Sequence, residues 1–168
     1  MEESKEEQEK VIKSNLNKQI IVNAPPGTGK TYTVSKKIEY IVKNRIAPIE
    51  QILVICFSRS AVKEIKDRLE IPEEQKRNIT IRTIDSFCSW VIKEIEEEHY
   101  KEIFNSTTYD ARIEYVLKML QNNQELQNSI KNMKHIIIDE VQDIVRYKSR
   151  INIRNVKNIQ FRFYIVRR

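Results

Sequence analysis

One loop in this sequence has the residue types that bind phosphate. Positions 24–31 read Ala-Pro-Pro-Gly-Thr-Gly-Lys-Thr. A short apolar run at 19–23 precedes the loop, and apolar residues at helical spacing follow it over 30–43. This pattern predicts a strand before the loop and a helix after it, which is the context that a phosphate-binding loop requires.

Each residue type in the loop has a chemical use. Gly27 and Gly29 let the backbone curl so that amide N–H groups point at phosphate oxygens. The start of the next helix adds its positive dipole end, Lys30 offers a charge to the β- and γ-phosphates, and Thr31 offers a hydroxyl to Mg²⁺. The residues expected to bind a nucleotide here are Ala24, Pro25, Pro26, Gly27, Thr28, Gly29, Lys30 and Thr31. The alternative without a ligand is a glycine-containing turn followed by a chance Lys-Thr pair.

A second motif places two carboxylates at the end of an apolar run. Positions 136–140 read Ile-Ile-Ile-Asp-Glu. Successive strand residues point in different directions, so the pair can do two jobs. Asp139 is expected to hold Mg²⁺, and Glu140 to orient and deprotonate an attacking water. An ordinary acidic turn is the alternative, and the phosphate-binding loop upstream favours the metal site.

Strand-like and helix-like segments alternate along the chain, which predicts an α/β fold: a parallel sheet covered by helices on both faces. Helices are expected at 2–14, 30–43, 60–69, 84–98 and 109–120, and strands at 19–23, 52–57, 79–83 and 135–138. In such a sheet the ligand site lies off the carboxyl ends of the strands. Both motifs fall at such ends.

Composition narrows the class of protein. The 168 residues are 40% hydrophobic and 32% charged, which suits one globular domain. No apolar run approaches the roughly 20 residues of a transmembrane helix, and the charged start is unlike a signal peptide, so a cytoplasmic protein is expected. Cys56 and Cys88 lie in apolar runs and are expected to be buried free thiols. His99 and His135 lack metal-ligand spacing.

The net excess of positive charge comes from the last 25 residues. Residues 144–168 hold eight Lys/Arg and no Asp/Glu, so residues 1–143 carry the remaining 22 basic and 24 acidic residues. A basic segment could contact nucleic acid. Residues 161–166 could also supply a fifth strand. The pattern gives no sign that arginines such as Arg146 or Arg167 fold back over the phosphate site.

Four motifs in order resemble the first motor domain of UvrD/Rep-type superfamily 1 helicases, over residues 7–144. Glu7-Gln8 resembles the family's glutamine motif, which implies that Gln8 reads the adenine edge. Positions 139–143, Asp-Glu-Val-Gln-Asp, match the family's Asp-Glu-x-Gln-Asp. The resemblance implies a RecA-like P-loop fold that uses ATP and Mg²⁺, with Gln142 helping to couple the nucleotide to the DNA track.

The other two motifs imply contacts with single-stranded DNA. Residues 52–69 resemble the motif that follows the family's second strand, and 83–88, Thr-Ile-Asp-Ser-Phe-Cys, resemble Thr-Phe-His-Ser. Asp85 stands where that motif has His. The implied DNA-binding residues are Phe57, Ser58, Arg59, Thr83 and Ser86. From the residues alone, Phe57 could be core, Arg59 a solvated charge, and Thr83 and Ser86 caps of the next helix.

We therefore expect residues 1–143 to be a partial UvrD-like ATP-binding domain and 144–168 a basic end, frameshifted or truncated. The family's Gly-Asp-x-x-Gln motif, its second motor domain and its γ-phosphate arginines are not found after residue 144. ATP binding with near-background hydrolysis and no unwinding is expected. The alternatives are a small stand-alone P-loop NTPase or kinase, and a non-catalytic nucleotide-binding or regulatory module. The oligomeric state stays open.

Overall fold

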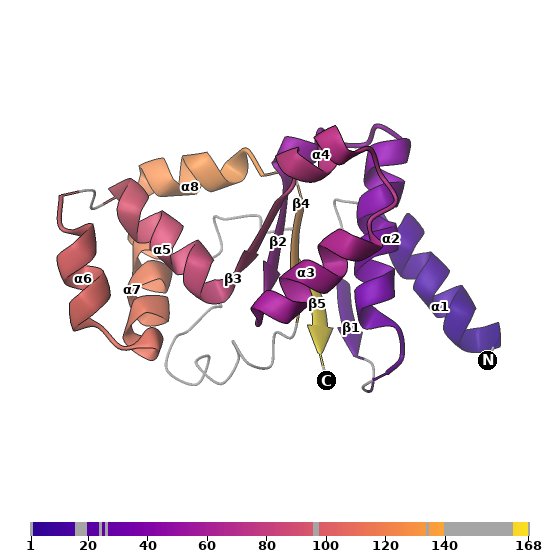
Figure 1. Ribbon diagram of the computed structural model, residues 1–168, viewed down its shortest axis with the longest axis horizontal. Helices are drawn as coiled ribbons and strands as arrows, with labels where there is room; N and C mark the ends of the chain where they lie inside the picture. The colour runs from indigo at the N-terminus through magenta and orange to yellow at the C-terminus, as the bar shows by residue number, and fades with distance from the viewer. Residues whose placement is uncertain are drawn as a thin grey trace.

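Five parallel strands form one sheet, in the order β1-β5-β4-β2-β3 (Figure 1). The computed structural model describes residues 2–15, 20–23, 25, 27–95, 98–133, 135–139 and 163–167. The strands are β1 (Ile20–Asn23), β2 (Ile52–Cys56), β3 (Thr80–Thr83), β4 (His135–Asp139) and β5 (Phe163–Arg167). Because neighbouring strands all pair in parallel, the α/β class predicted from the sequence is confirmed.

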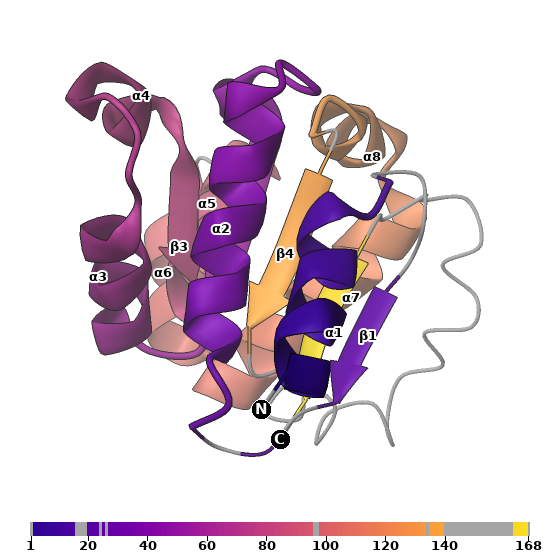
Figure 2. The same cartoon turned by 90° about the vertical axis from the view of Figure 1, so that its right-hand side faces the viewer.

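Helices cover both faces of this sheet (Figure 2). They are α1 (Glu2–Lys13), α2 (Lys30–Lys43), α3 (Arg59–Arg68), α4 (Glu73–Asn78), α5 (Ile84–Ile95), α6 (Tyr100–Ser106), α7 (Tyr109–Asn122) and α8 (Gln124–Lys131), with a 3₁₀ turn η1 (Ile49–Gln51). One hydrophobic core lies between the sheet and α2 with α3. A second core lies on the opposite face, under α5, α7 and α8.

Burial on both faces explains the apolar runs of two central strands, β2 and the middle of β4. All five residues of β2 and all five of β4 are buried. Within β2, Ile52 and Val54 join the core under α2, whereas Leu53 and Ile55 join the core under α5. A strand covered on both faces favours apolar side chains on each one, so alternation gives way to a continuous apolar run, which in β4 is Ile136 to Ile138 between the buried polar residues His135 and Asp139.

Some of the helices were predicted from the sequence and others were not. The apolar spacing predicted α2 with its observed ends. The short helix α4 was not predicted, because its sequence Glu-Glu-Gln-Lys-Arg-Asn contains no apolar residue and none of its residues is buried. Helical periodicity needs an apolar stripe to be visible. The helices α6 and α8 were missed as well.

The strand β5 confirms the fifth strand expected near 161–166. It lies inside the sheet, with Tyr164 opposite Ile20 of β1 and opposite Ile137 of β4. Its parallel direction carries Arg167 to a register position opposite Asn23, the last residue before the phosphate-binding loop. β5 thus ends at the same edge of the sheet as the loop at 24–31, which the charge pattern did not indicate.

Both cysteines are free and buried, as the sequence predicted. Burial raises the pKa of the Cys56 and Cys88 thiols to about 12, so both stay protonated at neutral pH. A buried protonated thiol is a poor nucleophile, so neither is a candidate for catalysis. In the described part of the chain, no helix is long and apolar enough to cross a membrane.

The core under α2 makes a prediction about stability. Ile137 of β4 is 1% exposed in that core, so Ile137→Ala should lower the free energy of unfolding by about 2–5 kcal/mol through lost burial and a cavity. Ile46, which is 42% exposed, supplies the matched control, and Ile46→Ala should change it by less than about 0.5 kcal/mol. Urea denaturation measures both variants. Equal losses would contradict this assignment of the core.

Candidate nucleotide-binding site

The loop between β1 and α2 is built around two glycines in left-handed conformations. Gly27 has φ +78° and Gly29 has φ +80°, a backbone region that side chains of L-residues rarely occupy. Gly29 is also short of space, since a Cβ there would lie 3.0 Å from Nε2 of Gln8. Any other residue would be strained at both positions, and close packing adds a second restriction at Gly29.

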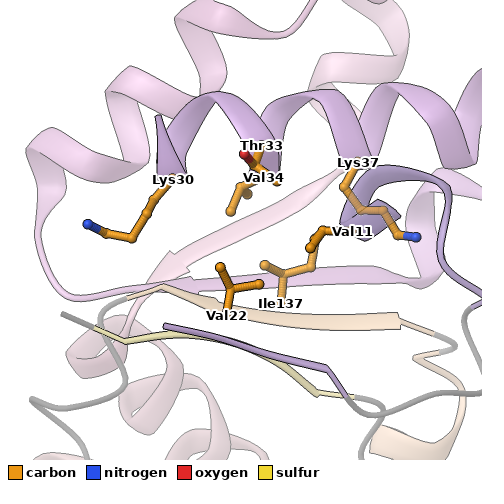
Figure 3. Close-up of a pocket in the computed structure, with 7 residues that line it drawn as sticks. All are labelled: Val11, Val22, Lys30, Thr33, Val34, Lys37 and Ile137. Carbon is orange, nitrogen blue, oxygen red and sulfur yellow. The ribbon is translucent and has the colours of Figure 1, made fainter. Parts of the chain in front are cut away.

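Hydrogen bonds close the loop on itself. Lys30 Nζ donates to the Pro25 carbonyl at 3.1 Å, and Thr28 Oγ1 donates to the same oxygen at 2.7 Å. Figure 3 shows Lys30 extending from the first turn of α2 towards the loop. The ammonium group of Lys30 therefore lies on the loop, on the side where α2 begins.

The glutamine expected near the nucleotide contacts this loop. Gln8 of α1 is half-buried, and its Nε2 donates to the Thr28 carbonyl at 2.9 Å. The two residues are 20 positions apart in sequence. The structure thus brings Gln8 and the loop together, although the contact of Gln8 with adenine stays a prediction.

Asp139 lies at the same edge of the sheet as the loop. It is the last residue of β4 and is 4% exposed. In register it is opposite Val166 of β5, which is opposite Val22 of β1. Thr31, half-buried in the first turn of α2, follows the loop at this edge. The fold therefore brings both expected Mg²⁺ ligands to one edge of the sheet.

Part of the expected site lies outside the described residues. This holds for Ala24 and Pro26 in the loop, and for Glu140 and Gln142 after β4. Their roles as loop residues, as general base and as coupling residue stay predictions.

The residues after β2 form the first half of the expected DNA contact. Phe57 is 49% exposed, so the alternative that it belongs to the core is wrong. Ser58 caps α3, because its Oγ accepts from the Ala61 N–H at 3.1 Å. Arg59, the first residue of α3, is exposed. The exposed aromatic ring of Phe57 and the exposed guanidinium group of Arg59 thus both follow the carboxyl end of β2.

The residues after β3 form the second half. Thr83 Oγ1 accepts from the Ser86 N–H at 3.1 Å, which confirms a capping role for Thr83. Ser86 Oγ accepts from Arg82 Nη1 at 3.5 Å. Because Thr83 is paired with Cys56 in the sheet, the ends of β2 and β3 lie side by side. The two expected DNA motifs are therefore neighbours, while the phosphate-binding loop lies further along the same edge.

Asp85, in the place of the family's His, has a structural partner that the sequence did not indicate. Its Oδ1 accepts from Arg112 Nη2 of α7 at 3.0 Å. Arg112 also donates to the carbonyls of Phe104 and Thr107, both at 3.1 Å. Asp85 thus joins α5 to α7, and Arg112 in turn contacts the carboxyl end of α6. No local motif predicts a pairing across 27 residues.

Lys37 is a second residue whose contacts the sequence motifs did not indicate. It lies on α2 and is 2% exposed, with its ammonium group at the end of α1. Its spacing from Lys30, Val34 and Ile41 places it on the apolar stripe of α2, which was a usable signal of burial.

Comparisons with known proteins agree with this architecture. Residues 4–102 match the UvrD/REP helicase N-terminal domain. A probable DNA helicase II homolog from Mycoplasma capricolum is 33% identical over 86 residues, covering 51% of this chain and 12% of that protein. A probable DNA helicase II homolog from Mycoplasma pneumoniae is 30% identical over 82 residues, covering 48% and 12%. The Gabija protein GajB from Bacillus cereus is 28% identical over 151 residues, covering 81% and 21%.

The matched region extends over more than half of the 168 residues and includes β1, the phosphate-binding loop, α2, β2 and β3. The chain spans about an eighth of the length of the Mycoplasma capricolum relative. From the family match and the parallel sheet together, the chain belongs to the UvrD/REP helicase N-terminal domain family.

Proposed function

We propose that this chain binds Mg²⁺-ATP through the loop at 24–31 and forms the ATP-binding part of a DNA helicase motor. One observation carries the proposal: Gly27 and Gly29 adopt left-handed conformations in a loop between a parallel strand and a helix, with Lys30 at the helix start. A loop of this kind directs backbone N–H groups at an anion. Gln8, in contact with Thr28, supports an adenine-reading role.

The residues at this edge fit ATP and Mg²⁺ in chemistry. Lys30 supplies a cation beside the loop, where it now donates to the Pro25 carbonyl, and a phosphate oxygen is an equivalent acceptor. Thr31 and Asp139 would hold Mg²⁺, which neutralises charge on the phosphate oxygens when it is bound. Glu140 is the residue that would deprotonate the attacking water.

The second half of the proposal concerns single-stranded DNA. An exposed ring on an edge that also carries a cation suits a base and its phosphate, because bases stack on aromatic side chains and the backbone is attracted to positive charge. Phe57 and Arg59 supply these groups, and Ser58, Thr83 and Ser86 flank them. DNA and nucleotide would then occupy neighbouring stretches of one sheet edge.

The nucleotide site gives the first test of function. Lys30→Ala should weaken Mg²⁺-ATP binding by more than about tenfold, because the variant removes a charge-assisted bond to phosphate. Lys43→Ala is the control, since Lys43 lies on the last turn of the same helix and is exposed. Isothermal titration calorimetry measures both variants. Equal affinity of wild type and Lys30→Ala would exclude this loop as the site.

The DNA site gives the second test. Phe57→Ala should weaken binding of an oligothymidylate by about fivefold or more, because stacking contributes about 1–3 kcal/mol per base. Ile46→Ala removes a comparably exposed apolar side chain between the end of α2 and η1, away from the carboxyl ends of the strands, and should have no effect. Fluorescence anisotropy at several salt concentrations supplies both affinities. Identical losses in the two variants would contradict a specific role for Phe57.

Turnover by the 168-residue chain on its own should be slow. An arginine that meets the charge on the γ-phosphate is worth about 10³–10⁵ in rate in related enzymes. The resemblance to UvrD/Rep-type helicases implies that such arginines lie in parts of the motor outside the motifs at 7–144. Phosphate release should therefore stay near that of Glu140→Gln, with or without single-stranded DNA. Release above about one per second that needs both DNA and Glu140 would show that the chain completes its own active site. In that case Arg167→Ala tests whether the last residue of β5 supplies the arginine.

A further inference from the structure

A lysine on α2 closes the carboxyl end of α1. Lys37 Nζ donates to the Ile12 carbonyl at 2.9 Å, to the Ser14 carbonyl, and to Ser14 Oγ at 3.0 Å. Ser14 Oγ in turn donates to the Val11 carbonyl at 2.6 Å. The last carbonyls of a helix have no partner within the helix, and a cation there is favoured by the helix dipole. Lys37 meets both conditions from a neighbouring helix.

The helix that Lys37 closes, α1, buries only a small part of its surface. Where side chains of α1 are described, over residues 5–13, only Gln8, Val11 and Ile12 are half-buried, and the others are exposed. These three form one narrow stripe at i, i+3 and i+4 spacing. An isolated helix of this length, 12 residues, is marginal in water, so the position of α1 depends on the contacts of this stripe and on the bonds from Lys37.

The same helix presents one lysine to the loop and the other to α1. Lys30 begins α2, and Lys37 lies two turns further on. Figure 3 shows their side chains extending in opposite directions from the helix, with Val11 of α1 lying between α2 and the strands. Val11 packs against the core under α2, and α1 also meets the loop through the bond from Gln8 to Thr28. Lys37 and Gln8 thus fix α1 at two points along one side.

We propose that Lys37 is a positioning residue for ATP recognition, which binds the end of α1 and so holds Gln8 against the phosphate-binding loop. The inference rests on the proposed nucleotide-binding function. Lys37 itself touches no nucleotide, because its ammonium group is buried among the carbonyls of α1. A buried cation is unfavourable unless hydrogen-bonded, so this lysine favours the one placement of α1 that supplies the oxygens.

The test compares ligands with and without an adenine. Lys37→Met removes the donors and keeps an unbranched apolar side chain. ATP affinity should fall roughly three- to tenfold, as expected for loss of one neutral hydrogen bond, and Mg²⁺-tripolyphosphate affinity should not change. Gln8→Ala should cause the same loss, and the double variant should lose no more than either single one. Burial lowers the pKa of Lys37 to about 8, so titrations are run at pH 7, where the ammonium form predominates.

Two further variants separate positioning from general stability. Lys36→Met is the matched control: Lys36 precedes Lys37 on α2 but pairs with Glu39 and Glu70, and ATP affinity should stay at the wild-type value. Lys37→Arg keeps a charged donor and should restore most of the lost affinity. If Lys37→Met does not fold, Ser14→Ala, which removes one acceptor, carries the same comparison of ligands with a smaller expected loss.

Hydrogen exchange of the nucleotide-free protein tests the contact independently of function. Amides of α1 should exchange faster in Lys37→Met than in wild type, while those of α2 should not. Unchanged exchange in α1, unchanged ATP affinity, or equal losses for ATP and tripolyphosphate would each overturn the proposal. Failure of wild type to bind either ligand would overturn the nucleotide-binding function and with it the recognition role. The exchange result would still decide whether Lys37 holds α1.

Discussion

Parallel pairing of β2 with β4 constrains everything else in the structure. Ile52 to Ile55 pair in register with His135 to Ile138, and both strands run in one direction. The carboxyl ends of parallel strands meet at one edge, so the chain must return across a face of the sheet before each new strand. Phe57 and Asp139, which follow or end these strands, therefore leave the same edge although 82 positions separate them. Strand direction alone therefore brings the candidate site residues to one edge, without any contact between their side chains.

Features set by neighbouring residues could be predicted from the sequence. The apolar runs predicted β2 and β4, because strands covered on both faces favour apolar residues on each face. Gly27 and Gly29 indicated a curled loop, and both have positive φ. Lys37 shows the limit of this approach. Its spacing from Val34 and Ile41 indicated burial, but the partners of its ammonium group depend on where another helix ends.

Features set by distant residues could not be predicted. The position of β5 inside the sheet is a choice of pairing partners, which the composition of 144–168 does not encode locally. Asp85 occupies a position where the resemblance implied a nucleic-acid contact, yet its carboxylate is bonded to Arg112. Thr83 could not be assigned from the sequence either, because the hydroxyl that caps α5 is of the same kind as one that would contact a phosphate.

The place of β5 has a consequence for how the chain is made. Along the described ladder, β1 pairs with β5 alone, and 144 positions separate the paired residues Ile20 and Tyr164. The amino-terminal strand is synthesised first, so β1 has no native pairing partner in the described sheet until β5 has been made. Meanwhile β4 exposes an open edge, the kind of surface on which strands of other chains pair. Until β5 pairs with both strands, this edge of β4 is open to incorrect pairing.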